Sequence, residues 1–418
     1  MHGGKTALSR HTIDGDPITG PAPFAGPHPE RGDPLYNHFL QFTLPRIGQL
    51  LLGAVLYLNF LTLPFVAPLA GRPLLYYGLP LLLVLAVGWV ARDPLGIGLA
   101  AAAQLCGLYL AGDLVSLLTG LAGAPAAGVW QRVWMGGLLA WALTAAVLIF
   151  GYWKAMRLCV TTYRLSTPKP LPGGRLRILQ ISDLHPGRGA MDRRRIPELR
   201  RRIQALQPDL IAFTGDIFDE YTPRADFEAF LNFFAALPAP LGKWYVLGNH
   251  DLFHYWQQPA YTRAELESRL AEGGIRLLED ETCLARDPAR PDAPPLRIAG
   301  RRDWLDTHGQ RAALADLLPG GPDGVYTILL DHEPRELALA VQAGADLVLC
   351  GHTHGGQIWP AGLAARLTRL NELNYGCRRW PGGAAIVSGG TGTWGYKLRT
   401  AARTELVWVE VTGRPSPG

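Results

Sequence analysis

The sequence predicts an α-helical membrane region followed by a layered α/β domain. Charge is almost absent from one part of the chain, and in the rest short apolar runs alternate with helical patterns. The charged residues between Arg46 and Lys154 are only Arg72, Arg92, Asp93, Asp113 and Arg132. After Arg157, Arg, Asp and Glu recur every few residues, as on the surface of a globular domain. The 418 residues suffice for about two or three domains.

Residues 1–45 are predicted to form a disordered tail. This leader is polar and rich in Pro and Gly, as in "GPAPFAGPHPERGDP", so it offers little apolar surface for a core. A cleaved signal peptide does not fit, because its apolar segment would have to lie close to the N-terminus.

The region 46–154 is predicted to hold about four transmembrane helices. Uncharged runs cover 47–71, 73–91, 94–112 and 133–153, each near the roughly 20 residues that cross a bilayer. Buried helices of a soluble protein are disfavoured, because four such runs would leave that protein no polar surface. The third run is ambiguous: it stops at Asp113 and a second apolar stretch, "LVSLLTGLAG", follows, so an interfacial or re-entrant segment is an alternative there.

Basic residues near the ends of the runs favour a multi-pass protein of the cell (inner) membrane with its second half in the cytoplasm. The flanks on the side of both termini carry Arg31, Arg46, Arg92, Lys154, Arg157, Arg164 and Lys169. The opposite loops carry only Arg72 and Arg132. A miscounted third run would reverse this orientation.

Cysteine and charge content narrow the class further. Five scattered cysteines exclude a disulfide framework and a CxxC metal site. The net charge of +5 suits a protein beside anionic lipid better than a dedicated nucleic-acid binder.

Residues 174–412 are predicted to form the α/β domain, after a linker at 155–173 and before a short tail at 413–418. Apolar runs predict strands at "LRILQIS", "DLIAFTGD", "KWYVLGNHD", "LRIAG", "YTILLDHEP", "DLVLCGHTHGG", "AAIVSGG" and "TELVWVEV". Helical patterns follow at "RRIPELRRRIQALQ" and around 224–236, 262–273, 310–318 and 334–343. This alternation predicts sheets covered by helices on their outer faces.

Polar residues cluster where the predicted strands end. They are Asp183, His185, Asp216, Asp219, Asn249, His250, Asp251, His332, His352 and His354. In open α/β sheets ligands bind at this edge, and packing alone does not explain five strand ends finishing in Asp, Asn or His.

Seven of these side chains form a mixed oxygen and nitrogen ligand set: two carboxylates, one amide and four imidazoles. Such a set suits Mn, Fe or Zn better than Ca or Mg, with Mn the first choice in vitro. Seven ligands fit two ions if one carboxylate bridges them, and two ions about 3.5–4 Å apart form a clamp that cleaves phosphate esters. His250, adjacent to Asn249, is placed to protonate the leaving oxygen.

The motifs "DLH", "GDIFD", "GNHD", "DHEP" and "GHTH", in this order, resemble the signature of the calcineurin-like metallophosphoesterase superfamily over about residues 174–412. The strings "GHTHGGQIWP" and "SGGTGTWGYKLR" are similar to a membrane-attached bacterial phosphodiesterase subgroup and to the transmembrane protein with metallophosphoesterase domain. The resemblance implies a four-layer sandwich of two mixed β-sheets flanked by helices.

The resemblance also implies a role for each position. The ligands of one ion would be Asp183, His185, Asp216 and His354. The ligands of the other ion would be Asp216, Asn249, His332 and His352, with Asp216 bridging. His250 would be the general acid or a donor to a phosphate oxygen, and Asp219 would orient it. Asp251 departs from the Glu found in many relatives.

Two features near these motifs admit two interpretations. The Arg-rich run "RGAMDRRRIPELRRR" is either a solvated helix face or a surface for anionic headgroups or a phosphorylated substrate. Trp359, Trp380 and Trp394 either pack locally or form a rim that touches the bilayer.

We therefore expect a membrane-bound phosphohydrolase that cleaves a phosphoester or phosphoanhydride by a metal-bridging hydroxide. Its expected partners are the bilayer and a phosphorylated small molecule or lipid, with no specific nucleic acid. One alternative is a pyrophosphatase acting on a UDP-linked acylated sugar. The other is a membrane sensor or scaffold that binds metal and ligand without turnover.

Overall fold

The computed structural model describes residues 10–12, 44–63, 65–91, 97–121, 134, 138–252, 259–306, 311–318, 324–359, 361–367 and 371–414. The chain divides into two compact units, Phe24–Gly151 and Met1–Pro23 with Tyr152–Gly418. The predicted tail, residues 1–45, lies outside the described residues except for a strand at Arg10–Thr12 and the first turn of a helix that begins at Leu44.

Helices occupy all four apolar runs predicted from the sequence. They are α2 (Leu44–Phe60), α3 (Pro73–Val90), α4 (Ile97–Leu121) and α6 (Leu138–Met156), of which the last turn belongs to the second unit. Among the described residues three segments are long and apolar enough to cross a membrane: α3, α4 and Leu139–Met156 of α6. The described apolar part of α2, Leu50–Phe60, is shorter.

The third run does not end at Asp113 as expected. Helix α4 continues through Asp113 to Leu121, and Asn59 Nδ2 of α2 donates to Asp113 Oδ2 at 3.0 Å. A carboxylate with a hydrogen-bond donor beside it is tolerated within an apolar helix, so the two apolar stretches join into one helix.

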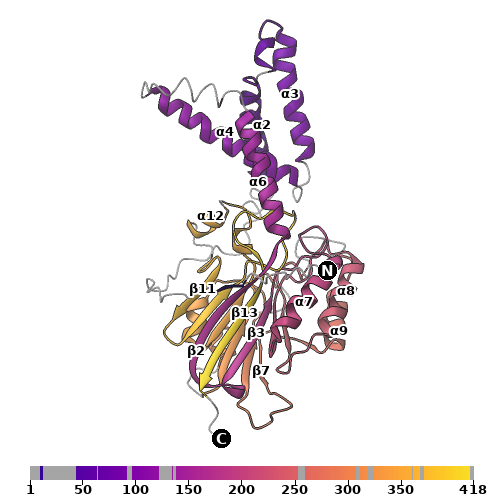
Figure 1. Ribbon diagram of the computed structural model, residues 1–418, viewed down its shortest axis with the longest axis vertical. Coiled ribbons are helices and arrows are strands. Elements are labelled where there is room, and N and C mark those ends of the chain that lie inside the picture. The colour runs from indigo at the N-terminus through magenta and orange to yellow at the C-terminus, as the bar shows by residue number, and fades with distance from the viewer. Residues whose placement is uncertain are drawn as a thin grey trace, which may run out of the picture. The chain divides into compact units, whose positions relative to one another are not determined.

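The second unit contains two mixed sheets (Figure 1). The seven-stranded sheet has the order β1-β2-β13-β3-β4-β5-β6, with β1 (Arg10–Thr12), β2 (Leu158–Pro170), β3 (Arg175–Ile181), β4 (Leu210–Thr214), β5 (Lys243–Val246), β6 (Ile275–Leu277) and β13 (Thr404–Arg414). The six-stranded sheet has the order β11-β12-β10-β9-β8-β7, with β7 (Glu281–Ala285), β8 (Leu296–Gly300), β9 (Tyr326–Leu330), β10 (Leu347–Cys350), β11 (Gly376–Trp380) and β12 (Gly383–Val387). The helices are α7 (Ile196–Leu206), α8 (Arg224–Ala235), α9 (Arg263–Glu272), α10 (Leu314–Leu317), α11 (Leu337–Gln342) and α12 (Ala361–Leu367).

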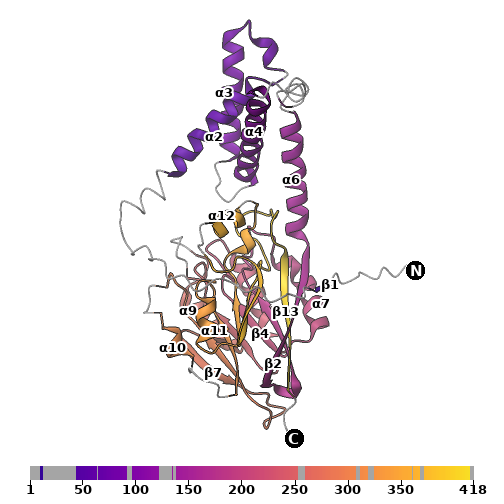
Figure 2. The same cartoon turned by 90° about the vertical axis from the view of Figure 1, so that its left-hand side faces the viewer.

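Alternating side chains of the strands build the layers. Ile178 of β3 packs between the sheets, whereas its neighbour Leu179 packs with α7, α8 and α9 on the outer face. In the other sheet Ile328 faces the centre and Leu329 packs with α10 and α11. The order is therefore helices, sheet, sheet, helices, with α7 and α11 on opposite sides in Figure 2, which confirms the predicted four-layer sandwich.

Residues 155–173 differ from the expected linker. Leu158–Pro170 form β2, which pairs in parallel with β13 from Leu158↔Thr404 onward. The first six residues of β2 are buried, while the Pro-containing second half is half-exposed. The turn residues of this stretch do not predict a strand. The strand is buried because it pairs with β13, which lies nearly 250 residues later in the chain.

Candidate metal centre

The predicted site residues lie on the segments that follow the strands, where the backbone turns sharply. Strand β3 ends at Ile181 and β10 at Cys350, and Asp183 and His352 follow two residues later. Eight non-glycine residues have positive φ among the described residues, and five of them are predicted ligands: Asp183, His185, Asp216, His352 and His354. Such φ values cost about 1–3 kcal/mol each and persist where function requires them.

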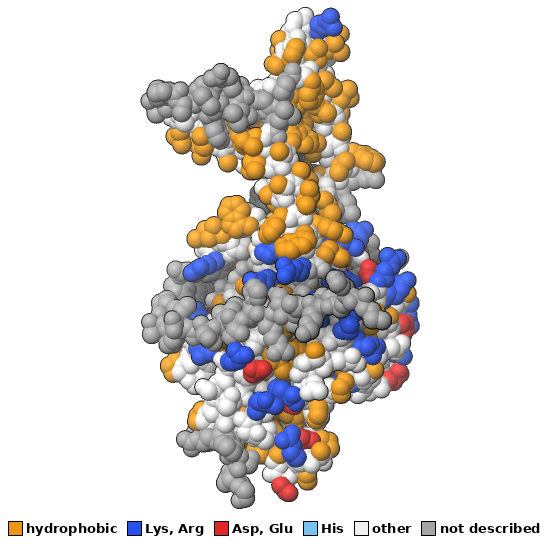
Figure 3. All heavy atoms as spheres, viewed as in Figure 1, with side chains coloured by type: hydrophobic (Ala, Val, Ile, Leu, Met, Phe, Trp, Pro, Cys, Tyr) orange, Lys and Arg blue, Asp and Glu red, His pale blue; other side chains and the backbone are white. Residues whose placement is uncertain are grey.

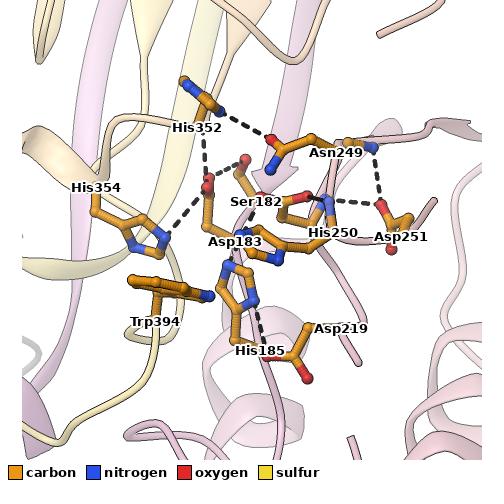
Figure 4. Close-up of polar contacts among 12 residues, drawn as sticks. Ser182, Asp183, His185, Asp219, Asn249, His250, Asp251, His352, His354 and Trp394 are labelled. Carbon is orange, nitrogen blue, oxygen red and sulfur yellow. Dashed lines mark hydrogen bonds and ion pairs between the residues drawn. The ribbon is translucent and has the colours of Figure 1, made fainter. Parts of the chain in front are cut away.

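One metal-capable group consists of Asp183, His185 and His354, all buried (Figure 4). Asp183 is held by Ser182 Oγ, which donates to Oδ2 at 2.5 Å, and by the backbone N–H of His352, which donates to Oδ1 at 2.9 Å. His354 Nε2 lies 3.6 Å from Asp183 Oδ1. Carboxylate and imidazole groups therefore converge on one point.

The second group consists of Asp216, His332 and His352. Asn249 lies beside it, since its Oδ1 is 3.0 Å from His352 Nδ1. The structure thus brings together the ligand set predicted for the second ion, with its amide oxygen next to an imidazole of the group.

Asp216 lies between the two groups. Its Oδ2 is 3.8 Å from His185 Nε2 in the first group and 3.1 Å from His332 Nε2 in the second. Its Oδ1 accepts the backbone N–H of His250 at 2.8 Å, which fixes the carboxylate plane. This is the position that a bridging carboxylate takes.

The hydrogen bonds of the imidazoles leave buried nitrogens without a partner. His332 Nδ1 donates to the Thr214 carbonyl at 2.8 Å, and His185 Nδ1 donates to Asp219 Oδ2 at 3.1 Å. The Nε2 atoms of both rings are buried and lack a hydrogen-bond partner among the described residues. The same is true of Nδ1 of His354. A carbonyl can only accept, so Nδ1 of His332 carries a proton and Nε2 is the atom that faces the Asp216 carboxylate. Burial by itself lowers the pKa of His332, but Asp216 outweighs it and raises that pKa well above its usual value, so a positive charge is favoured between the two groups. A metal ion would supply this charge in place of the Nε2 proton, and the donor set fits two divalent ions.

The protonation of His354 agrees with a ligand role. Burial lowers the pKa of His354 well below its usual value, and the neighbouring His185 adds to the effect. The imidazole is therefore neutral at pH 7, the form that binds metal.

His250 lies beside the first ligand group, and Glu220 is its carboxylate partner. Its ring is 5.2 Å from that of His185 and 5.4 Å from that of Trp394. Burial by itself lowers the pKa of His250, but Asp216 and Glu220 outweigh it and raise that pKa to about 9. The predicted partner, Asp219, instead holds His185, and the carboxylate hydrogen-bonded to His250 is Glu220.

Asp251 ties two ligand loops together. It is fully buried and accepts the backbone N–H groups of Asp216 at 2.7 Å and Gly248 at 2.9 Å. It also accepts Phe218 N–H at 3.0 Å and the Tyr245 hydroxyl at 2.8 Å. This carboxylate therefore positions the Asp216 loop relative to the Asn249 loop.

Glycines let these loops approach each other. A Cβ on Gly248 would lie 2.3 Å from Asp216 Oδ1, and a Cβ on Gly351 would lie 2.3 Å from Asp183 Oδ2. Gly390, with φ of 92°, lies against Asp183 and His354. Gly355 and Gly356 turn the chain away, against Ala402 and Gly362.

Sequence reasoning missed Glu220 and Arg399. Glu220 is adjacent to Asp219, and sequence spacing does not show which of two neighbouring carboxylates faces His250. Arg399 is fully buried, and its guanidinium donates to the carbonyls of His354 at 3.0 Å, Gly389 at 2.5 Å and Gly392 at 2.6 Å. It holds the His354 loop in place.

Comparisons with known proteins match the region of the chain that carries the candidate metal centre. The family model for calcineurin-like phosphoesterases matches residues 176–356. A metallophosphoesterase of Aquifex aeolicus is 31% identical over 64% of this chain and 98% of its own length. The transmembrane protein with metallophosphoesterase domain of Danio rerio is 28% identical over 71% of this chain and 66% of its own length. Among solved structures, TT1561 of Thermus thermophilus aligns with a TM-score of 0.33 and 14% identity over 51% of this chain and 89% of that one.

Proposed function

The chain belongs to the calcineurin-like phosphoesterase family of metal-dependent hydrolases, and from that premise we propose that it hydrolyses a phosphoester or phosphoanhydride at a membrane. The observation that carries the proposal is the position of Asp216. One oxygen of this carboxylate faces His185 and His332, which belong to different ligand groups. That arrangement suits a pair of ions sharing a carboxylate, as in two-metal phosphoester cleavage.

Two divalent ions bound here would polarise the phosphate oxygens and lower the pKa of a water molecule. The chain's own residues do the rest. Asp183, His185 and His354 would hold one ion, and Asn249, His332 and His352 would hold the other, with Asp216 common to both. Thr214 and Asp219 fix the tautomers of two of the imidazoles, so that each presents its Nε2 atom.

His250 supplies the proton to the leaving oxygen. Glu220 accepts from Nδ1, so the proton to be transferred is on Nε2. His250 is only 9% exposed, so the ring is held in place and bulk water has little access to it. A positioned imidazolium of this kind contributes about 10²–10⁴-fold to rate in other enzymes.

Membrane attachment is the second part of the proposal. It is supported by three helices with the length and apolarity of membrane spans and by relatives named as transmembrane proteins. Lys and Arg are in excess at those ends of the apolar runs that lie on the same side as both termini. This excess supports a cytoplasmic location for the second unit, which carries the metal centre. A phosphorylated lipid or a lipid-linked phosphate is the substrate class that such a location favours. A reporter fused after Gly418 that is active only outside the cytoplasm would overturn the orientation.

The test of the reaction uses the full chain purified in detergent. Bound metal is first removed with a chelator. The unchanged protein and the variants Asp216→Asn and His250→Ala are then each assayed with bis-p-nitrophenyl phosphate before and after Mn²⁺ is added. We expect release only with Mn²⁺, abolished by Asp216→Asn and reduced by His250→Ala. Stoichiometric Mn²⁺ binding without release on any phosphoester would instead establish a metal-binding sensor.

A further inference from the structure

Three segments of the second unit meet beside the metal centre. They are the last turn of α6 with Arg157 after it (152–157), residues 357–359 with α12 (361–367), and the loop that leads into β13 (391–404). Gln357 joins two of them: its side chain pairs with the backbone N–H and C=O of Trp394, both at 3.0 Å, and its carbonyl accepts the N–H of Thr400 at 2.9 Å. These segments form a single surface, here called the rim.

The end of α6 is bonded into this rim. Lys154 Nζ donates to the carbonyl of Thr400 at 3.2 Å and to that of Ala401. The same Thr400 uses its hydroxyl to accept the backbone N–H of Trp359 at 2.8 Å. Thr400 thus connects the end of α6 to the backbone of Trp359, just before α12.

Large apolar side chains stand exposed on the rim. Trp359 is 65% exposed, Leu363 is 49% exposed and Leu367 is 74% exposed. Leu363 and Leu367 lie on α12 and Trp359 lies just before it. Figure 3 shows hydrophobic side chains gathered at this helix, with Lys and Arg side chains close by. Exposed Leu and Trp side chains placed together on one short helix and its flank indicate a surface that is covered in use.

The charge of the rim indicates what covers it. The three segments contain six basic residues, Lys154, Arg157, Arg366, Lys397, Arg399 and Arg403, and no Asp or Glu. Of these, Arg157, Arg366 and Arg403 are exposed, whereas Arg399 is buried. An apolar ridge with Trp and Leu and a basic border, and without acidic residues, matches the interface of an anionic bilayer, where Trp rings and Lys or Arg side chains settle at headgroup level.

We propose that the rim rests in the headgroup layer of an anionic bilayer, with Trp359, Leu363 and Leu367 inserted and the basic side chains on lipid phosphates. Helix α6 adds the exposed side chains of Tyr152 and Trp153 to the rim. Trp394 of the rim lies 5.4 Å from His250, so this placement would bring the metal centre close to the headgroups. The inference rests on the membrane attachment proposed above and does not depend on the chain being a hydrolase.

The experiment labels the full chain with bimane at Leu363→Cys and reconstitutes it into vesicles containing lipids with a nitroxide near the headgroup. The matched control is Leu284→Cys on β7, since Leu284 is 52% exposed and outside the rim. Unsubstituted protein, labelled in parallel, gives the background from Cys283 and Cys377, which are half-buried. We expect strong loss of bimane emission at 363 and none at 284.

Charge is tested in the same vesicles. Quenching at 363 should be greater with phosphatidylglycerol than with phosphatidylcholine alone, and the double variant Arg366→Glu, Arg403→Glu should remove that difference. Arg276→Glu, outside the rim, should leave the difference intact. Equal quenching at 363 and 284 overturns the proposal. A blue-shifted, unquenched label at 363 also overturns it, because the ridge then packs on protein, such as a second copy of the chain.

Two further readouts separate this inference from the function. Flotation of the proteoliposomes reports whether the chain is inserted at all. Mn²⁺-dependent release of p-nitrophenol reports hydrolysis. Loss of quenching in floating, active protein counts against the rim alone, whereas quenching in inactive protein counts against the hydrolase alone.

Discussion

Glu220 holds His250: both carboxylate oxygens lie 3.0–3.1 Å from Nδ1 of the ring. The neighbouring Asp219 points the other way and holds His185, a candidate metal ligand, at 3.1 Å. Two adjacent carboxylates thus hold two imidazoles for which we propose different tasks: His250 would donate a proton and His185 would bind an ion. Because of these two contacts, we expect replacing Glu220 and replacing Asp219 to have different effects.

Replacing Glu220 with Gln should shift the pH dependence of turnover. The pKa of His250 is raised to about 9, with Glu220 among the causes, so the protonated acid persists through neutral pH and is lost as pH rises through that value. Removing the negative charge lowers this pKa, and kcat should therefore fall at a lower pH than in the unchanged protein. The measurement is kcat against pH at saturating Mn²⁺.

The choice of substrate sharpens this experiment. A p-nitrophenolate leaving group needs little protonation, whereas an alkyl alkoxide needs the proton from His250. Glu220→Gln should therefore lower kcat more for an alkyl phosphodiester than for the p-nitrophenyl ester. If kcat falls equally for both esters, and the pH at which kcat declines is the same as in the unchanged protein, then Glu220 only supports the fold.

Replacing Asp219 with Asn should weaken metal binding. The amide can turn its NH₂ group toward His185 and stabilise the wrong tautomer, and loss of such a partner typically costs about 10–100-fold in metal affinity. Titration of chelated protein with Mn²⁺, followed by calorimetry, measures the effect. Glu220→Gln is the matched control and should bind Mn²⁺ as the unchanged protein does. Unchanged affinity in Asp219→Asn would contradict the assignment.

Divalent ions should stabilise the second unit. Within the part of the chain that the structure describes, the buried Nε2 atoms of His185 and His332 face the Asp216 carboxylate, so ions bound there would stabilise the folded protein. At 100 times Kd the gain is about 2.7 kcal/mol. Thermal unfolding should shift upward with Mn²⁺, return with chelator, and show no shift in Asp216→Ala. A shift of equal size in Asp216→Ala would place the stabilising ions elsewhere.

Much of the sandwich could be predicted because its central strands are continuous apolar runs such as Leu347–Cys350, followed directly by ligands. The strands that escaped prediction had weaker patterns. β6, β7 and β11 are sheet edges with one neighbour each and half-exposed side chains, and β2 carries turn residues yet is buried by β13. Long-range pairing decides such segments, and local sequence does not encode it.

The ligands could be predicted because each follows a strand and has a metal-binding side chain. The partners of these ligands could not, since Glu220 and Asp219 differ only in the direction in which a turn points them. Arg399 was equally hard to predict, because its partners are backbone carbonyls that any residue carries. Asp251 belongs to the motif "GNHD", but the motif does not show that its carboxylate accepts the backbone N–H groups of Asp216 and Gly248.

Replacing Gly351 with Ala should disrupt the metal centre. An added Cβ would lie 2.0 Å from Ser182 Oγ and 2.3 Å from Asp183 Oδ2, so the carboxylate that begins the first ligand group must move. We expect lower Mn²⁺ affinity and loss of most hydrolysis, with the sheets intact by circular dichroism. Gly107→Ala is the control: it lies in α4 with no atom within 4 Å of the added Cβ and should keep both properties. If Gly351→Ala binds Mn²⁺ normally, Asp183 does not need this close approach, and its position in the first ligand group is less constrained than the structure indicates.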